Sequence, residues 1–147
     1  MRNRVEVMHG VNLDQLGRRD PLHYGSLDFP QLERQIELYA REVDLVPRFF
    51  HTNHEGEFVE HLHRLEGLAD AVVLNPGSWT HYAWAIRDAL ELTALPAVEV
   101  HLSDVHNREE FRRLSVFEGL PSVIGTVSGQ GPAGYREALA LVKDELA

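Results

Sequence analysis

The feature that most constrains the fold of this chain is a regular alternation of short apolar runs with longer segments whose apolar residues recur at helical spacing. Five runs are expected to be strands, at residues 5–8, 46–50, 71–74, 96–100 and 122–127. Four helical segments are expected at residues 29–43, 58–68, 83–92 and 135–146. Strands that alternate with helices are typical of βαβ units, in which the helix carries the chain back so that the next strand runs parallel to the last.

This rhythm predicts an α/β fold, a three-layer sandwich in which a five-stranded parallel sheet has helices on both faces. Five strands favour the flavodoxin-like order 2-1-3-4-5. Asp28 is a candidate N-cap for the first long helix. At 147 residues the chain is expected to form one domain, residues 1–147, that buries roughly two thirds of the surface of its unfolded state.

Composition and charge argue against several classes of protein. The net charge of -9 disfavours a protein held on nucleic acid by bulk electrostatics. No apolar run approaches the ~20 residues of a membrane-spanning helix, and the first residues do not resemble a signal peptide. The lack of cysteine excludes disulfides and thiolate sites. We therefore expect a cytoplasmic protein that binds neither membrane nor nucleic acid.

A polar loop at residues 10–25 follows the first apolar run and has glycines at both ends and in the middle. It carries Asn12, Arg18, Arg19 and Tyr24, which a purely connecting loop does not require. Arginine supplies fixed positive charge, and a tyrosine that is ionised beside it can act as a base. This loop therefore indicates a segment that closes over an anionic substrate.

Polar clusters also follow the next three strands, at residues 53–55, 75–81 and 101–113. Because ligands of open parallel sheets bind beyond the carboxyl ends of the strands, we expect these clusters and the first loop to form one site. Lys143, near the C-terminus, is the single lysine among fourteen basic residues. This leaves little scope for chemistry through a Schiff base.

Three alternatives find little support in the residues. A receiver-like signalling module of the same fold would carry an acidic pair after the first strand and a lysine after the fifth, and both are absent. A nucleotide-binding protein of the P-loop class would need G-x-x-x-x-G-K-[ST], which does not occur; the spacing G-x-G-x-x-G does occur at residues 129–134, after the last expected strand, but alone it is not specific for nucleotides. His61 and His63 point away from each other on a helix, and His101 and His106 lack a third ligand, so we expect no metal site.

Six motifs, in order along the chain, carry a resemblance to a known enzyme family. The first loop is similar to G-P-N-L-N-x-L-G-x-R-x-P-x-x-Y-G, and residues 53–57 are similar to the S-N-H-E-G-E segment. Residues 75–81 and 85–89 match N-P-x-x-x-T-H and A-I-x-D-A, and residues 99–103 and 108–112 match E-V-H-x-S and R-E-x-F-R. By these motifs the chain resembles the type II 3-dehydroquinate dehydratases over nearly its whole length.

The resemblance implies an enzyme, a carbon–oxygen hydro-lyase that removes water from 3-dehydroquinate to give 3-dehydroshikimate through an enolate intermediate. It implies a place in the shikimate pathway of aromatic amino acid biosynthesis, no cofactor, and a homododecamer built from trimers. The type I enzyme is excluded because it resembles a TIM barrel with an imine-forming lysine, and this chain is too short for a barrel.

The resemblance also implies roles for individual residues. Tyr24 would be the base that removes the proton from C2, and Arg19 would favour its ionised form. His101 would be the acid for the leaving hydroxyl, oriented by Glu99 two residues earlier on the same face of the strand. Asn12 would hold a water or a dipole against the enolate. Without the motifs, Tyr24 would be a loop residue packed on the rim, and His101 a core histidine with satisfied hydrogen bonds.

The substrate itself would be held by a second set of residues. Asn75, His81 and Arg112 would bind the ring hydroxyls. The backbone amides of Leu102 and Ser103 would bind the carboxylate, helped by the N-terminus of a helix that follows them.

Four residues are less firmly placed by the sequence. Asp88, seven residues after His81 on one expected helix face, would enter the site of a neighbouring subunit, or else be a solvated helix carboxylate. Arg18, Arg108 and Arg113 are equally compatible with the site and with the surface.

The chain departs from the family pattern at a few positions in the first loop. Val11 replaces the usual proline, which is expected to loosen the turn before Asn12. Asp14 and Asp20 stand where Asn and Glu are usual, and residues 129–132 vary the glycine-rich segment. None of these departures removes a group that the chemistry requires.

Overall fold

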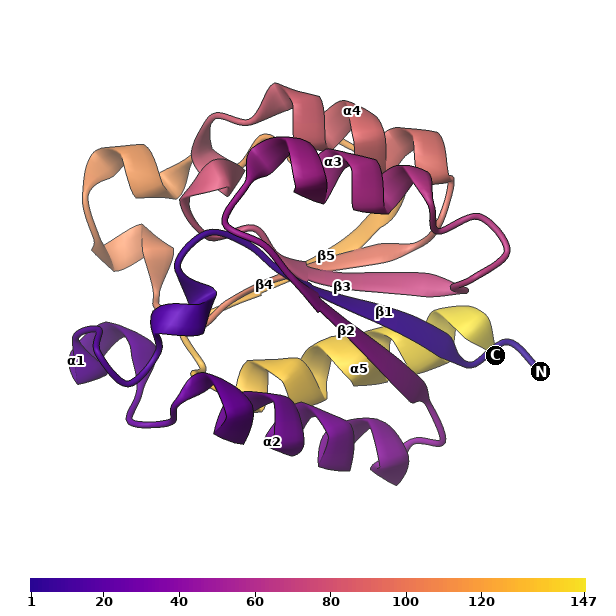
Figure 1. Ribbon diagram of the computed structural model, residues 1–147, viewed down its shortest axis with the longest axis horizontal. Helices are drawn as coiled ribbons and strands as arrows, with labels where there is room; N and C mark the ends of the chain where they lie inside the picture. The colour runs from indigo at the N-terminus through magenta and orange to yellow at the C-terminus, as the bar shows by residue number, and fades with distance from the viewer.

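The computed structural model describes all 147 residues and contains one parallel sheet of five strands. The strands are β1 (Arg4–His9), β2 (Val46–His51), β3 (Ala71–Asn75), β4 (Ala97–His101) and β5 (Val123–Ser128). Their order across the sheet is β2-β1-β3-β4-β5, with every neighbouring pair parallel (Figure 1). The predicted fold class and strand order are confirmed, and each predicted strand lies within a residue or two of an observed one.

Four long helices cover the two faces of the sheet (Figure 1). The helices α2 (Phe29–Glu42) and α5 (Ala133–Leu146) pack on one face, and α3 (Glu55–His63) and α4 (Trp84–Thr93) pack on the other. Side chains alternate between the faces along β1: Val5 and Val7 pack with α2 and α5, whereas Met8 packs with α3 and α4. No helix is both long enough and apolar enough to cross a membrane.

The ends of the helices follow local signals in the sequence. Asp28 caps α2 as predicted, because its side chain accepts a hydrogen bond from the amide of Gln31, whose own side chain accepts from the amide of Asp28. The helix α3 ends at His63, five residues before the predicted end. Residues 64–69 form turns that include Gly67 at φ 76°, and Leu65 is still buried there. The apolar spacing therefore continues beyond the helix itself.

Several short elements were not predicted from the sequence. The first loop contains a 3₁₀ turn, η1 (Leu13–Gln15), and a four-residue helix, α1 (Pro21–Tyr24). Asp20 caps α1 by accepting from the amide of Leu22 at 2.9 Å, and proline occupies the first helical position. Three more 3₁₀ turns follow strands β3 and β4: η2 (Gly77–His81), η3 (Val105–Asn107) and η4 (Glu110–Arg113).

Strand register places the polar clusters together. His9 lies beside His51 and Asn75 in the sheet, and His101 lies beside Ser128, so the strands end along one edge. The first loop, η2, η3 and η4 all leave from this edge.

Candidate active site

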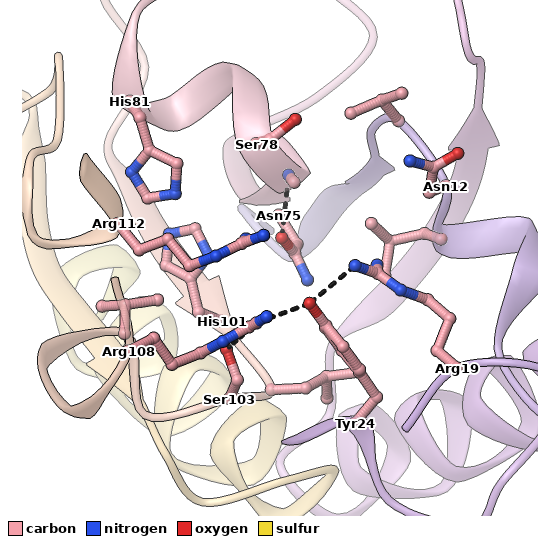
Figure 2. A pocket seen from close by; sticks show the side chains of 15 residues that line it. Asn12, Arg19, Tyr24, Asn75, Ser78, His81, His101, Ser103, Arg108 and Arg112 are labelled. Carbon is pink, nitrogen blue, oxygen red and sulfur yellow. Dashed lines mark hydrogen bonds between the residues drawn. The ribbon is translucent and has the colours of Figure 1, made fainter. Parts of the chain in front are cut away.

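A cavity opens at the carboxyl edge of the sheet, between the first loop and the segments that follow β3 and β4 (Figure 2). All of the side chains labelled there are polar or charged, and they come from segments that are far apart in the sequence. Its lining is made of Val11, Asn12, Leu13, Arg19, Tyr24, Asn75, Gly77, Ser78, His81, His101, Leu102, Ser103, Val105, Arg108 and Arg112.

Nine of the eleven residues expected in the site line this cavity. They are Asn12, Arg19, Tyr24, Asn75, His81, His101, Leu102, Ser103 and Arg112. Glu99 does not line it but is buried directly behind His101. Asp88 is on the exposed side of α4, outside the cavity, and forms no hydrogen bond or ion pair within the chain.

The hydroxyl of Tyr24 lies between two guanidinium groups. Arg19 donates to it from Nη2 at 2.6 Å, and Arg108 donates from Nη1 at 2.5 Å (Figure 2). The guanidinium of Arg19 also lies over the tyrosine ring, 3.7 Å from its centroid. Burial lowers the pKa of Arg19 from its ordinary value, against the opposing effect of Tyr24. The tyrosine oxygen therefore accepts two charge-assisted hydrogen bonds, which are stronger than bonds between neutral groups.

Arg108, whose place the sequence left open, lines the cavity. It comes from the segment between η3 and η4, and its side chain is only 10% exposed. It also donates to Ser103 Oγ at 3.3 Å. Arg18 and Arg113, the other two arginines whose place the sequence left open, lie on the surface. Arg18 donates to Gln15, and Arg113 is exposed on η4.

His101 and Glu99 form a buried pair, as their spacing on the strand predicted. Nε2 of His101 is 2.6 Å from Oε2 of Glu99. Burial opposes ionisation of Glu99, but hydrogen bonds from His101, Thr80 and Ser115 outweigh it and hold its pKa below the usual value. Because a carboxylate only accepts, Nε2 of His101 carries a proton and Nδ1 is left for exchange with a ligand.

The hydrogen bonds of His81 select a different tautomer from that of His101. Its Nδ1 lies 2.7 Å from the carbonyl oxygen of Leu114, which can only accept, so Nδ1 carries the proton and Nε2 is free to accept. Burial lowers the pKa of His81, which favours the neutral ring at pH 7. The rings of His81 and His101 are stacked with centroids 6.4 Å apart. The cavity therefore has two histidines with different electrostatic partners.

The base of the first loop is fixed by backbone contacts. Asn12 adopts a left-handed conformation at φ 68°, and its amide donates to Oδ1 of Asn53 at 2.8 Å. Nδ2 of Asn53 donates to Asp14 at 3.2 Å. Asp14, which stands where the family usually has Asn, therefore has a hydrogen-bond partner within the chain. Asn75 accepts from the amide of Gly77 at 3.0 Å, which holds its side chain at the cavity. Asn53 belongs to the polar cluster at residues 53–55 that was expected at this edge, although the sequence analysis gave it no role of its own.

Two geometric expectations about the site need correction. No long helix starts behind Leu102 and Ser103: the next element, η3, has three residues, and Asp104 caps it by accepting from the amide of His106. Support from a helix dipole is therefore absent there. In addition, His81 ends η2 whereas Asp88 lies within α4, so the two residues do not share one helix face.

Comparison with known proteins identifies a family. The family model described as class II dehydroquinase matches residues 3–143. A protein named 3-dehydroquinate dehydratase from Thermotoga petrophila is 46% identical over 143 residues, covering 97% of this chain and 96% of that protein. A protein of the same name from Bacillus pumilus is 42% identical over 139 residues, covering 95% of this chain and 93% of that protein.

Solved structures agree with the sequence comparison. The type II dehydroquinase from Butyrivibrio crossotus superposes with a TM-score of 0.90 at 36% identity, covering 96% of this chain and 97% of that one. The type II dehydroquinase from Propionibacterium acnes gives a TM-score of 0.89 at 36% identity, covering 98% of both chains. With this fold, this cavity and a family match over nearly its full length, the chain belongs to the class II dehydroquinase family.

Proposed function

We propose that this protein removes water from 3-dehydroquinate to give 3-dehydroshikimate, as a type II dehydratase of the shikimate pathway. The proposal rests on two features at one cavity. The phenol of Tyr24 lies between two guanidiniums, and His101 forms a buried pair with the carboxylate of Glu99 behind it. An elimination next to a ketone needs a base, a way to stabilise enolate charge and an acid for the leaving group. The cavity contains a candidate for each.

Tyr24 is the proposed base of the first step. As the phenolate it takes the proton from C2, and the electrons of that C–H bond pass to the C3 ketone to form an enolate. Arg19 and Arg108 stabilise the phenolate before the transfer. Asn12, at the cavity wall, is placed to hold a water or a dipole against the enolate oxygen.

His101 is the proposed acid of the second step. The enolate electrons form the C1–C2 double bond, the C1–O bond breaks, and the proton on Nδ1 passes to the leaving oxygen to make water. His101 is then neutral with its proton on Nε2, facing Glu99. Exchange with solvent returns a proton to Nδ1 and removes one from Tyr24, which restores the starting state. Both proton carriers belong to the chain, so we propose that the reaction needs no metal, organic cofactor or lysine imine.

The remaining residues of the cavity are proposed to hold the substrate. Asn75, His81 and Arg112 line the wall and can bind ring hydroxyls. His81 acts as an acceptor there, because its Nδ1 proton is already committed to Leu114. The backbone amides of Leu102 and Ser103, two residues that line the cavity, are proposed to bind the substrate carboxylate.

The proposed assembly is a homododecamer of trimers in which Asp88 enters the site of a neighbouring subunit. It is supported by the outer face of α4, where Trp84 is 64% exposed, Leu92 is 76% exposed, and Asp88 lies between them. Large apolar side chains exposed together often mark a contact surface. Mixing Asp88→Ala subunits with Tyr24→Phe subunits should restore activity that neither variant has alone, if the sites are shared between subunits. Independent sites would give no restoration.

The proposed reaction is tested by adding 3-dehydroquinate to the pure protein and following the ultraviolet absorbance of the conjugated enone product. Absorbance should rise in the presence of EDTA as well as in its absence, and Tyr24→Phe should abolish the rise. Tyr39→Phe is the matched control, because Tyr39 lies on α2 and does not line the cavity, so this variant should retain full activity. No absorbance change with the wild-type protein, or loss of activity with EDTA, would refute the proposal.

A further inference from the structure

Three side chains hold Glu99, and only one of them belongs to the cavity. His101 donates to Oε2, Thr80 donates to the same oxygen, and Ser115 donates to Oε1 at 2.8 Å. Glu99 is 1% exposed, and Thr80 is equally buried. Thr80 and Ser115 lie behind the carboxylate and do not line the cavity that would hold the substrate.

The direction of the Ser115 hydrogen bond is fixed by its neighbours. Its hydroxyl oxygen accepts from the amide of Phe117 at 3.2 Å, so its own proton is directed to Glu99. Thr80 is anchored through its backbone, because its carbonyl accepts from the amide of Val116 at 2.8 Å. Both hydroxyls therefore act as donors that are held in place by the segment at residues 114–117.

A carboxylate with all its donors in place has less tendency to take a proton from a neighbouring imidazolium. Hydrogen bonds to the charged form of an acid favour that form, and here burial alone would favour the neutral one. If Glu99 lost two of its three donors, the proton between it and His101 would shift toward the carboxylate. His101 would then carry its remaining proton on Nδ1 in a neutral ring, and it could not serve as a charged acid.

We propose that Thr80 and Ser115 are positioning residues for the elimination: they keep Glu99 ionised and oriented, so that His101 keeps its Nε2 proton and offers the proton on Nδ1 to the leaving oxygen. This inference rests on the proposed function for its catalytic consequence. The segment at residues 114–117 then influences the hydrogen bonds of both histidines of the cavity, since Leu114 accepts from His81 while Ser115 donates to Glu99, the partner of His101.

The kinetic test uses substitutions that remove only the hydroxyl. Thr80→Val and Ser115→Ala should each lower kcat by about 10- to 100-fold, the range expected for losing one hydrogen bond to a charged group. KM should stay within about twofold, because neither side chain lines the cavity. Thr80→Ser and Ser115→Thr retain the hydroxyl and should recover most of kcat. Thr126→Val is the matched control, because Thr126 borders the same space behind Glu99 but makes no hydrogen bond to the carboxylate.

A spectroscopic test separates this inference from the proposed function. Nitrogen-15 NMR of histidine-labelled protein reports the protonation of Nδ1 and Nε2, and His101→Asn identifies the signals of His101. In wild type, Nε2 of His101 should be protonated. In the Thr80→Val, Ser115→Ala double variant, the proton population should move toward Nδ1 of His101. If wild type fails to act on 3-dehydroquinate, the proposed function falls while the NMR result still decides this inference.

Two results would overturn the positioning role. One is an unchanged kcat together with an unchanged His101 tautomer in the double variant. The other is an equal loss of kcat in Thr80→Val and Thr80→Ser, since that loss would come from packing and not from the hydroxyl.

Discussion

Removing the two guanidiniums at Tyr24, singly and together, is the sharpest test of how the phenol becomes a base. One hydrogen bond to a charged group contributes about 1.5–3 kcal/mol, so the loss of either arginine is expected to change the rate measurably. Both Arg19 and Arg108 are within 2.6 Å of the hydroxyl oxygen. The role that the sequence analysis proposed for Arg19 alone is therefore proposed for both arginines.

The assay is kcat and KM for 3-dehydroquinate at fixed pH. Each single variant, Arg19→Ala or Arg108→Ala, should lower kcat by about 10- to 100-fold, the range expected for losing one hydrogen bond to a charged group. The loss should be larger for Arg108→Ala, since its side chain is 10% exposed whereas Arg19 belongs to a partly exposed loop where water screens charge. The double variant should lose more than either single variant.

Arg18→Ala is the matched control, because Arg18 is adjacent in the loop but donates to Gln15 and not to Tyr24. Its kcat and KM should match those of wild type. If either single variant raises only KM and leaves kcat unchanged, that arginine binds substrate and does not assist the proposed base.

Three further predictions concern stability. Gly77→Ala should cost more than about 1 kcal/mol in the free energy of unfolding, because Gly77 has φ 66° and a Cβ there would lie 2.7 Å from the carbonyl oxygen of Val11; an unchanged Tm would contradict this. Hydrogen bonds from Arg4 lower the pKa of Asp70 to about 2, so Asp70→Asn should lower Tm at pH 7, and the difference from wild type should shrink as pH falls from 4 toward 2. Burial lowers the pKa of His9, so wild type should lose stability as pH falls below 6.5, and His9→Asn should flatten that slope in thermal melts from pH 7 to 5.

The fold was predictable because its information is local and redundant. Each strand is an apolar run bounded by polar or turn residues, and each long helix shows apolar residues on one face. The short elements escaped prediction because three or four residues make too little periodic signal. Even so, Asp20 followed by Pro21 is a recognisable start for α1.

The site was predictable in its membership but not in its pairings. Glu99 and His101 could be paired from sequence because residues two apart on a strand share a face. Tyr24 and Arg108 are 84 positions apart, and only the parallel order of the strands brings their loops together. Ser115 could not be chosen in advance, because a serine that contacts a buried carboxylate has no sequence pattern of its own.

The distribution of charge explains how an acidic chain can hold an anionic substrate. The net charge of -9 acts over the whole surface, and at physiological ionic strength its effect decays over about 8 Å. Three guanidiniums line the cavity, and only that of Arg112 has a close carboxylate partner, Glu109 at 2.6 Å. No carboxylate lies closer than 4.0 Å to Arg19 or Arg108. The Glu99–His101 pair adds no net charge once the imidazole is protonated. The local excess of two positive charges therefore equals the two negative charges that the proposed reaction brings together there, the phenolate of Tyr24 and the carboxylate of the substrate.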